Sequence, residues 1–170
     1  MKRSLLLAAT LAALAAAPAA LALTEGEYAV IQKAANEYLT SLPKHEYYDV
    51  MAEDVLKRIQ SGKKDFVIVD VRVPRDKKFD QGHLPGAQFI GVMDLAKPES
   101  LAKLPKDKDI IVHCDTGQVQ NKILTVLHML GYDKAYAMKW GYMSWKVAPP
   151  TGLTLGEINA SITKNYPVEK

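Results

Sequence analysis

Apolar and polar residues follow two patterns along the chain, one typical of buried strands and one typical of amphipathic helices. Residues 65–72 and 109–113 are almost continuously apolar, as strands covered on both faces of a parallel sheet are. Shorter apolar stretches predict further strands at 47–50, 88–90 and 134–138.

Helical periodicity occupies most of the intervals between these strands. A helix is predicted over 52–63, where Gly62 stops it, and another over 117–132, with Gly131 as its C-terminal cap. The remaining intervals predict a loop over 73–90, with a turn before its strand, and weaker helices over 94–104 and 141–146.

Strands that alternate with helices indicate an α/β fold with a central parallel sheet and helices on both faces. In such sheets, ligands bind beyond the carboxyl ends of the strands. Arg72 and Cys114 both come directly after predicted buried strands, so both are expected at that edge.

An additional helix is predicted over 24–42, before the first strand. Thr24 can cap it, with Glu27 as the partner in a capping box, and Pro43 ends it. Its apolar face either packs on the main domain or contacts a second copy or another partner. That face consists of Tyr28, Ile31, Ala35, Tyr38 and Leu42.

The first 22 residues have the pattern of a cleavable signal peptide. A basic start precedes an apolar run, Pro18 interrupts the run, and small residues at 20–22 predict cleavage after Ala22. We therefore expect export to the periplasm and no membrane span after cleavage. An uncleaved anchor is the alternative, since 5–23 is nearly long enough to cross a bilayer, although alanine inserts weakly.

Charge and histidine spacing exclude two classes of function. Loss of Lys2 and Arg3 with the signal leaves 20 basic residues against 19 acidic ones, which argues against a nucleic-acid binder. The four histidines have no ligand spacing, so neither a metal nor another cofactor is predicted. These are His45, His83, His113 and His128.

Cys114 is the only cysteine, so it cannot form an intramolecular disulfide. An exported thiol is either buried as a small apolar residue or used as a nucleophile, and both interpretations stay open. The loop that follows can direct backbone N–H groups toward the sulfur, and the next helix adds its positive N-terminal dipole. Gly117 permits the turn, and strand alternation directs His113 to the other side, where a structural role is expected.

The order of several motifs resembles the rhodanese, or sulfurtransferase, family over roughly residues 48–145. The matching stretches are "VDVR" (69–72), "GHLPGA" (82–87), "IVHCDTGQ" (111–118), "LGY" (130–132) and "KWGYMSWK" (139–146). The resemblance implies a rhodanese-like fold and a persulfide on Cys114, formed and consumed by a ping-pong mechanism. With the signal peptide predicted at 1–22, the chain is expected to continue as a helical extension at 23–46, the rhodanese-like domain at 47–150 and a tail at 151–170.

The loop departs from the family pattern C-R-x-G-x-R-[ST]. Asp115 and Val119 replace its arginines, Gln120 replaces its hydroxyl residue, and Trp140 replaces the first glycine of a later "GG". Repulsion by a carboxylate roughly 6 Å away destabilises a thiolate by about 2 to 3 kcal/mol. This exceeds the stabilisation of the thiolate by the helix N-terminus, unless the carboxylate faces solvent. The orientation of Asp115 stays open, and in either case thiosulfate is expected to bind poorly.

An exported domain with a single cysteine resembles periplasmic single-domain polysulfide-sulfur transferases, and this resemblance implies a sulfur-containing donor and a thiol or respiratory redox-protein acceptor. Asp70 is expected to pin the loop, and Arg75, Lys77 and Lys78 either replace the missing arginines or are solvated. A weakly catalytic binding module is the alternative, and a homodimer is an additional interpretation. A cysteine phosphatase is disfavoured, since Gln120 stands where that chemistry needs arginine.

The predicted site comprises Cys114 as nucleophile and Asp115, Thr116, Gly117, Gln118, Val119, Gln120, Arg72 and Arg75 as substrate-binding residues.

Overall fold

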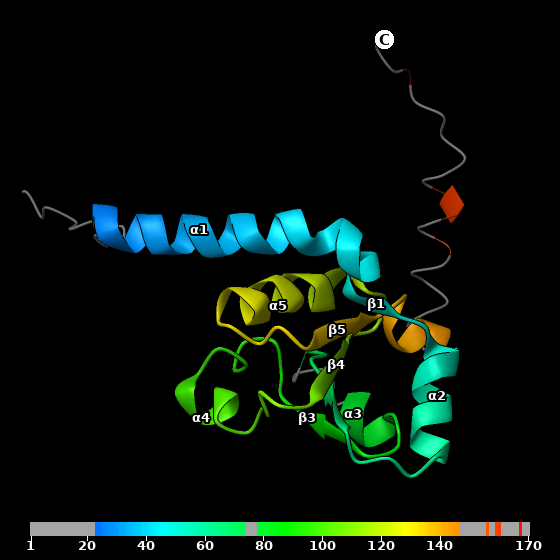
Figure 1. Ribbon diagram of the computed structural model, residues 1–170. Helices are drawn as coiled ribbons and strands as arrows, with labels where there is room; N and C mark the ends of the chain where they lie inside the picture. The colour runs from blue at the N-terminus through cyan, green and yellow to red at the C-terminus, as the bar shows by residue number, and fades with distance from the viewer. Residues whose placement is uncertain (1–22, 74–77, 147–155, 157–158, 161–166, 168–170) are drawn as a thin grey trace, which may run out of the picture.

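A computed structural model describes residues 23–73 and 78–146, together with residues 156, 159–160 and 167. One parallel sheet lies between helices (Figure 1). The strands are β1 Asp49–Val50, β2 Phe66–Asp70, β3 Ala87–Phe89, β4 Asp109–His113 and β5 Ala135–Met138. The helices are α1 Glu25–Ser41, α2 Ala52–Gln60, α3 Lys78–Gln81, α4 Pro98–Leu101 and α5 Gln118–Met129, with 3₁₀ segments η1 Leu42–Tyr48 and η3 Gly141–Ser144.

The sheet has the order β1-β5-β4-β2-β3, with every pairing parallel. This confirms the predicted α/β architecture. Alternate residues of the central strands enter two cores: Val69 and Val112 pack with α5, whereas Ile68 and Ile111 pack with Val55 of α2. Continuous apolar sequence is therefore needed because both faces of β2 and β4 are covered.

Because all strands are parallel, their carboxyl ends meet at one edge of the sheet. Cys114 follows β4 directly, Arg72 lies two residues after β2, and Trp140 lies two residues after β5. Segments that are far apart in the sequence therefore converge on the cysteine.

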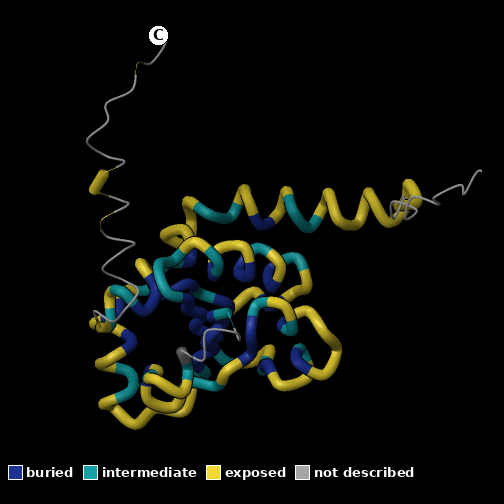
Figure 2. Tube along the Cα trace, turned by 180° about the vertical axis from the view of Figure 1, so that it is seen from behind, coloured by how far each residue is buried: buried dark blue, intermediate teal, exposed yellow. Residues whose placement is uncertain are grey.

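The long helix α1 follows the sequence prediction only in part. Its capping box is present, with the Glu27 N–H donating to Thr24 Oγ1 at 3.3 Å. Tyr38 is buried against the core, but Tyr28 is 63% exposed and Ile31 is 40% exposed. Figure 2 shows the first half of the helix extending beyond the domain, so the predicted apolar face packs only along its second half.

Other differences are local. The segment predicted as a loop contains the short helix α3, and the weak helix at 94–104 contracts to α4. The last predicted helix is instead the 3₁₀ segment η3, and its Tyr142 and Met143 N–H groups bind carbonyls of the cysteine loop. No helix within the described ranges is long and apolar enough to cross a membrane. The predicted signal peptide and most of the tail lie outside those ranges.

Candidate active site around Cys114

The loop after β4 holds the cysteine sulfur close to a backbone amide. The Gly117 N–H donates to Cys114 Sγ at 3.3 Å. Gly117 has φ +97°, a conformation that other residues rarely adopt, so glycine is what turns this N–H toward the sulfur. The first N–H groups of α5, which begins at the next residue, have no carbonyl partner within the helix. The loop therefore offers donors to negative charge on or next to the sulfur.

The side chain of Gln120 supports the loop from beneath. Its Oε1 accepts from the Cys114 N–H at 2.8 Å, and its Nε2 donates to the Met138 carbonyl at 2.5 Å. The residue is only 1% exposed. One neutral amide thus connects the start of the loop to the end of β5. Gln120 was predicted from the sequence as a substrate-binding residue in place of the family's hydroxyl residue, and no sequence signal indicated this bridge.

The segment after β5 closes over the loop backbone. The Tyr142 N–H donates to the Cys114 carbonyl at 2.7 Å, and the Met143 N–H donates to the Asp115 carbonyl at 2.9 Å. Gly141, at φ +59°, lies directly against the loop, where an added Cβ would come within 2.6 Å of the Cys114 carbonyl oxygen. Trp140 also has positive φ, at +65°, and is 58% exposed beside the loop. Two backbone hydrogen bonds and the close approach of Gly141 therefore hold η3 against the cysteine loop.

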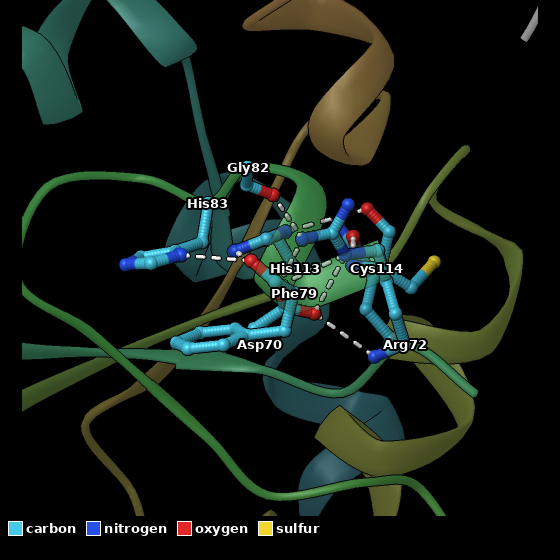
Figure 3. Close-up of polar contacts among 8 residues, drawn as sticks. Asp70, Arg72, Phe79, Gly82, His83, His113 and Cys114 are labelled. Atoms are coloured by element: carbon cyan, nitrogen blue, oxygen red, sulfur yellow. Dashed lines mark hydrogen bonds and ion pairs between the residues drawn. The ribbon is translucent and has the colours of Figure 1, made fainter. Parts of the chain in front are cut away.

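A buried polar cluster lies behind the cysteine backbone. Arg72 Nη2 contacts Asp70 Oδ2 at 2.6 Å and the Gly82 carbonyl at 2.6 Å, while its guanidinium lies 4.5 Å from the centre of the Tyr142 ring. Figure 3 shows the Cys114 sulfur directed away from this cluster. Arg72 is therefore placed as a support beneath the site and not beside the sulfur, and Asp70 pins the turn after β2 through it.

His113 belongs to the same cluster and faces away from the nucleophile, in the direction that strand alternation predicts. The residue is fully buried, with Nδ1 3.4 Å from the Cys114 carbonyl oxygen and Nε2 3.8 Å from Asp70 Oδ2. Burial lowers the pKa of His113, against the opposing effect of Asp70. A neutral histidine in this position is suited to packing and not to activating the thiol.

The family model for the rhodanese-like domain matches residues 51–148. The chain belongs to the rhodanese-like domain family. Its relatives include the "Probable adenylyltransferase/sulfurtransferase MoeZ" of Mycobacterium tuberculosis, 32% identical over 87 residues, or 51% of this chain. The alignment spans only 21% of MoeZ. A "Sulfurtransferase" of Allochromatium vinosum is 24% identical over 97 residues, which cover 57% of this chain and 86% of the relative.

Solved structures with the same fold include the Alr3790 protein from Anabaena sp., with a TM-score of 0.52 and 21% identity, covering 66% of this chain and 91% of that one. A rhodanese-like domain protein from Staphylococcus aureus has a TM-score of 0.51 and 23% identity, covering 59% and 93%. These structures establish the fold. The N-terminal helix α1 precedes the matched domain.

Within this rhodanese-like domain, the predicted loop residues are contiguous around the sulfur but differ in exposure. Asp115, Thr116 and Gly117 are half-buried, and Gln118 is exposed. Val119 packs against the core cluster of β4 and α5. Arg75 lies outside the described residues. Among those described, no group of three His, Cys, Asp or Glu side chains is arranged to hold a metal ion.

The two buried histidines make folding stability depend on pH. Burial lowers the pKa of both His113 and His128 in the folded state, so the unfolded chain binds more protons below its ordinary histidine pKa of about 6.5. The free energy of unfolding is expected to fall as pH drops from 7 toward 5, by at most about 1.4 kcal/mol per pH unit for each extra proton. Urea unfolding of the protein and of His113→Gln at both pH values measures this. If the free energy of unfolding of His113→Gln fell with pH as steeply as that of the unsubstituted protein, the contribution of His113 to this pH dependence would be contradicted.

Proposed function

We propose that this protein is a periplasmic sulfurtransferase or sulfane-sulfur carrier that holds the transferred sulfur as a persulfide on Cys114. The observation that carries the proposal is the Gly117 N–H directed at the sulfur, between a buried strand and the N-terminus of α5. Membership of the rhodanese-like family, together with relatives named as sulfurtransferases, supports the class of reaction.

The chemistry requires two sulfur transfers. The thiol first loses its proton to solvent, and the loop N–H and the helix terminus stabilise the negative charge on sulfur. The thiolate attacks the terminal sulfur of a polysulfide, so that an Sγ–S bond forms, an S–S bond breaks and the shortened polysulfide leaves with the electron pair. An acceptor thiolate then attacks the outer sulfur and leaves as a persulfide, which restores the Cys114 thiolate. No external oxidant or reductant is needed.

Polysulfide-type donors suit this loop better than thiosulfate does. No residue from 114 to 120 is cationic, and the nearest buried guanidinium, that of Arg72, is already paired with Asp70. A compact dianion such as thiosulfate would therefore meet the carboxylate of Asp115 and no cationic side chain from the loop itself. A chain-like polysulfide can present its terminal sulfur while its remaining charge stays in water.

Adding positive charge to the loop is expected to increase the use of thiosulfate. Asp115→Arg combined with Val119→Arg should raise the rate with thiosulfate at least about tenfold, equivalent to about 1.4 kcal/mol of transition-state stabilisation. Because Val119 packs on the core, Asp115→Arg alone is tested beside it. Asp115→Asn measures how much of the gain is removal of repulsion. If the folded double variant changes neither the thiosulfate rate nor the polysulfide rate, charge at these positions does not select the donor.

The alternative function is a rhodanese-like binding module that carries a chalcogen or docks to a redox partner without turnover. The absence of cations in the loop favours it. Steady-state assays with excess polysulfide and a thiol acceptor separate the two functions. Many turnovers per Cys114 support a transferase, whereas one labelled equivalent that is discharged only by a protein partner supports the module.

The N-terminal residue of the exported protein tests the proposed periplasmic location. We expect the exported protein to begin at Leu23 and to appear in the periplasmic fraction, because the small residues at 20–22 suit signal peptidase. N-terminal sequencing of the exported protein measures this. Recovery of intact Met1 in the membrane fraction would support an anchor instead.

The exposed first half of α1 is available to a partner in this proposal. Tyr28 and Val30 are 63% and 70% exposed and lie outside the matched domain. Its exposed apolar side chains could bind either a second copy of this chain or an acceptor protein.

A further inference from the structure

A hollow of about 510 Å³ opens at the edge of the sheet opposite to Cys114. Phe66, the first residue of β2, lines it, together with Pro85 and Gly86 just before β3. β4 runs parallel to β2, with Phe66 paired to Asp109 and Ile68 paired to Ile111, so three to five residues of strand, roughly 10 to 16 Å, separate this lining from the level of Cys114. It is therefore not part of the candidate active site.

Among the described residues, this hollow is lined by three lysines, Lys63, Lys64 and Lys103, and by no carboxylate. The nearby carboxylates are engaged elsewhere, since Arg58 contacts Asp109 at 2.8 Å and Asp65 at 3.3 Å. Within the described part of the chain, none of the three lysines forms an ion pair. The result is a local excess of positive charge on a protein that is otherwise nearly neutral.

The rest of the lining is largely apolar. Ile59 and Phe66 are partly buried side chains that extend the core beneath α2, and the Arg58 guanidinium lies 4.6 Å from the centre of the Phe66 ring. Pro85 adds a rigid apolar wall. A ligand seated here would bury an apolar body on these side chains while its charged end met the lysines.

We propose that this hollow binds a small organic anion, with a carboxylate, sulfonate or phosphate at one end of an apolar body. The volume lies in the range of small-molecule sites. Lysine ammonium groups are mobile point charges, so they accept any of these anionic groups. The described residues of the lining supply ammonium groups and apolar side chains, so we assign the hollow to binding. It is independent of the sulfur chemistry proposed for Cys114.

Calorimetric titration of the purified protein with naphthalene-2-sulfonate at low salt tests the proposal. We expect one binding site, with affinity weakened at least tenfold by the combined substitutions Lys63→Gln, Lys64→Gln and Lys103→Gln. Lys122→Gln, an exposed lysine on α5, is the matched control and should leave the affinity unchanged. Sodium sulfate and neutral 2-naphthol, which supply the charge and the apolar body separately, should each bind at least tenfold more weakly than the sulfonate.

Three results would overturn this assignment: no binding of the sulfonate at millimolar concentration, equal affinity in the folded triple variant, or sulfate binding as tightly as the sulfonate. The three lysines are exposed, so the triple variant is expected to keep its fold, which circular dichroism verifies. Cys114→Ser should bind the sulfonate as the unsubstituted protein does. The anion site can therefore fail or succeed separately from the proposed sulfur transfer.

Discussion

Cys114→Ser is expected to reduce sulfur transfer from polysulfide to a thiol acceptor by at least roughly a thousandfold. The serine hydroxyl is nearly the same size as the thiol, so the loop can keep its contacts. It cannot form the persulfide on which both transfers depend. Steady-state rates with polysulfide and an acceptor thiol measure the loss.

The matched measurements separate lost chemistry from lost structure. Cys114 is 3% exposed and packs in the core cluster, so thermal unfolding of the serine variant is recorded beside its activity. A variant that remains folded and inactive supports the nucleophile. A folded variant with undiminished turnover would contradict it, since no other residue of this chain has a thiol.

Gly141→Ala is expected to distort the cysteine loop and to lower stability by about 2 kcal/mol or more. An alanine Cβ would lie 2.6 Å from the Cys114 carbonyl oxygen and 2.9 Å from the Gly117 nitrogen, both backbone atoms that have little freedom to move. Because that nitrogen donates to the sulfur, the rate of persulfide formation should fall at least tenfold. Urea unfolding and single-turnover kinetics measure the two effects.

Gly62→Ala provides the control for this experiment. Gly62 has φ +68°, close to that of Gly141, but nothing lies within 4 Å of an added Cβ. It therefore carries the backbone strain of a left-handed alanine without the collision, and the rate should be unchanged. If both variants lose the same stability and neither loses rate, the contact between Gly141 and the loop does not control the site.

The parts of the fold that depend on local pattern could be predicted from the sequence. Continuous apolar runs identified β2 and β4, because covered parallel strands need apolar residues on both faces. The parallel topology then placed Cys114 at the carboxyl edge. Thr24 and Glu27 form the expected capping box, and Gly117 makes the expected turn, because these features involve residues only a few positions apart.

Features that depend on distant partners could not be predicted. Helical periodicity indicated a continuous apolar face on α1. The length of that face that is covered depends on where α5, which packs against it, ends, and periodicity does not contain this information. Tyr28 is therefore exposed although it belongs to the predicted face. Arg72 was predicted to bind the sulfur-containing substrate. Its guanidinium instead donates to the carbonyl of Gly82, which lies ten residues away in the sequence, so this partner could not be predicted from local pattern. The bridge from Gln120 to Met138 likewise requires knowing that β4 and β5 are neighbours.

Intact-mass analysis of the purified protein after incubation with polysulfide tests the central claim most directly. The account predicts an added mass of one sulfur atom on the unsubstituted protein, removable by a thiol acceptor, and no addition on Cys114→Ser. Thiosulfate should give much less of the same adduct. The absence of any adduct on the unsubstituted protein, or an equal adduct on the serine variant, would contradict a persulfide on Cys114.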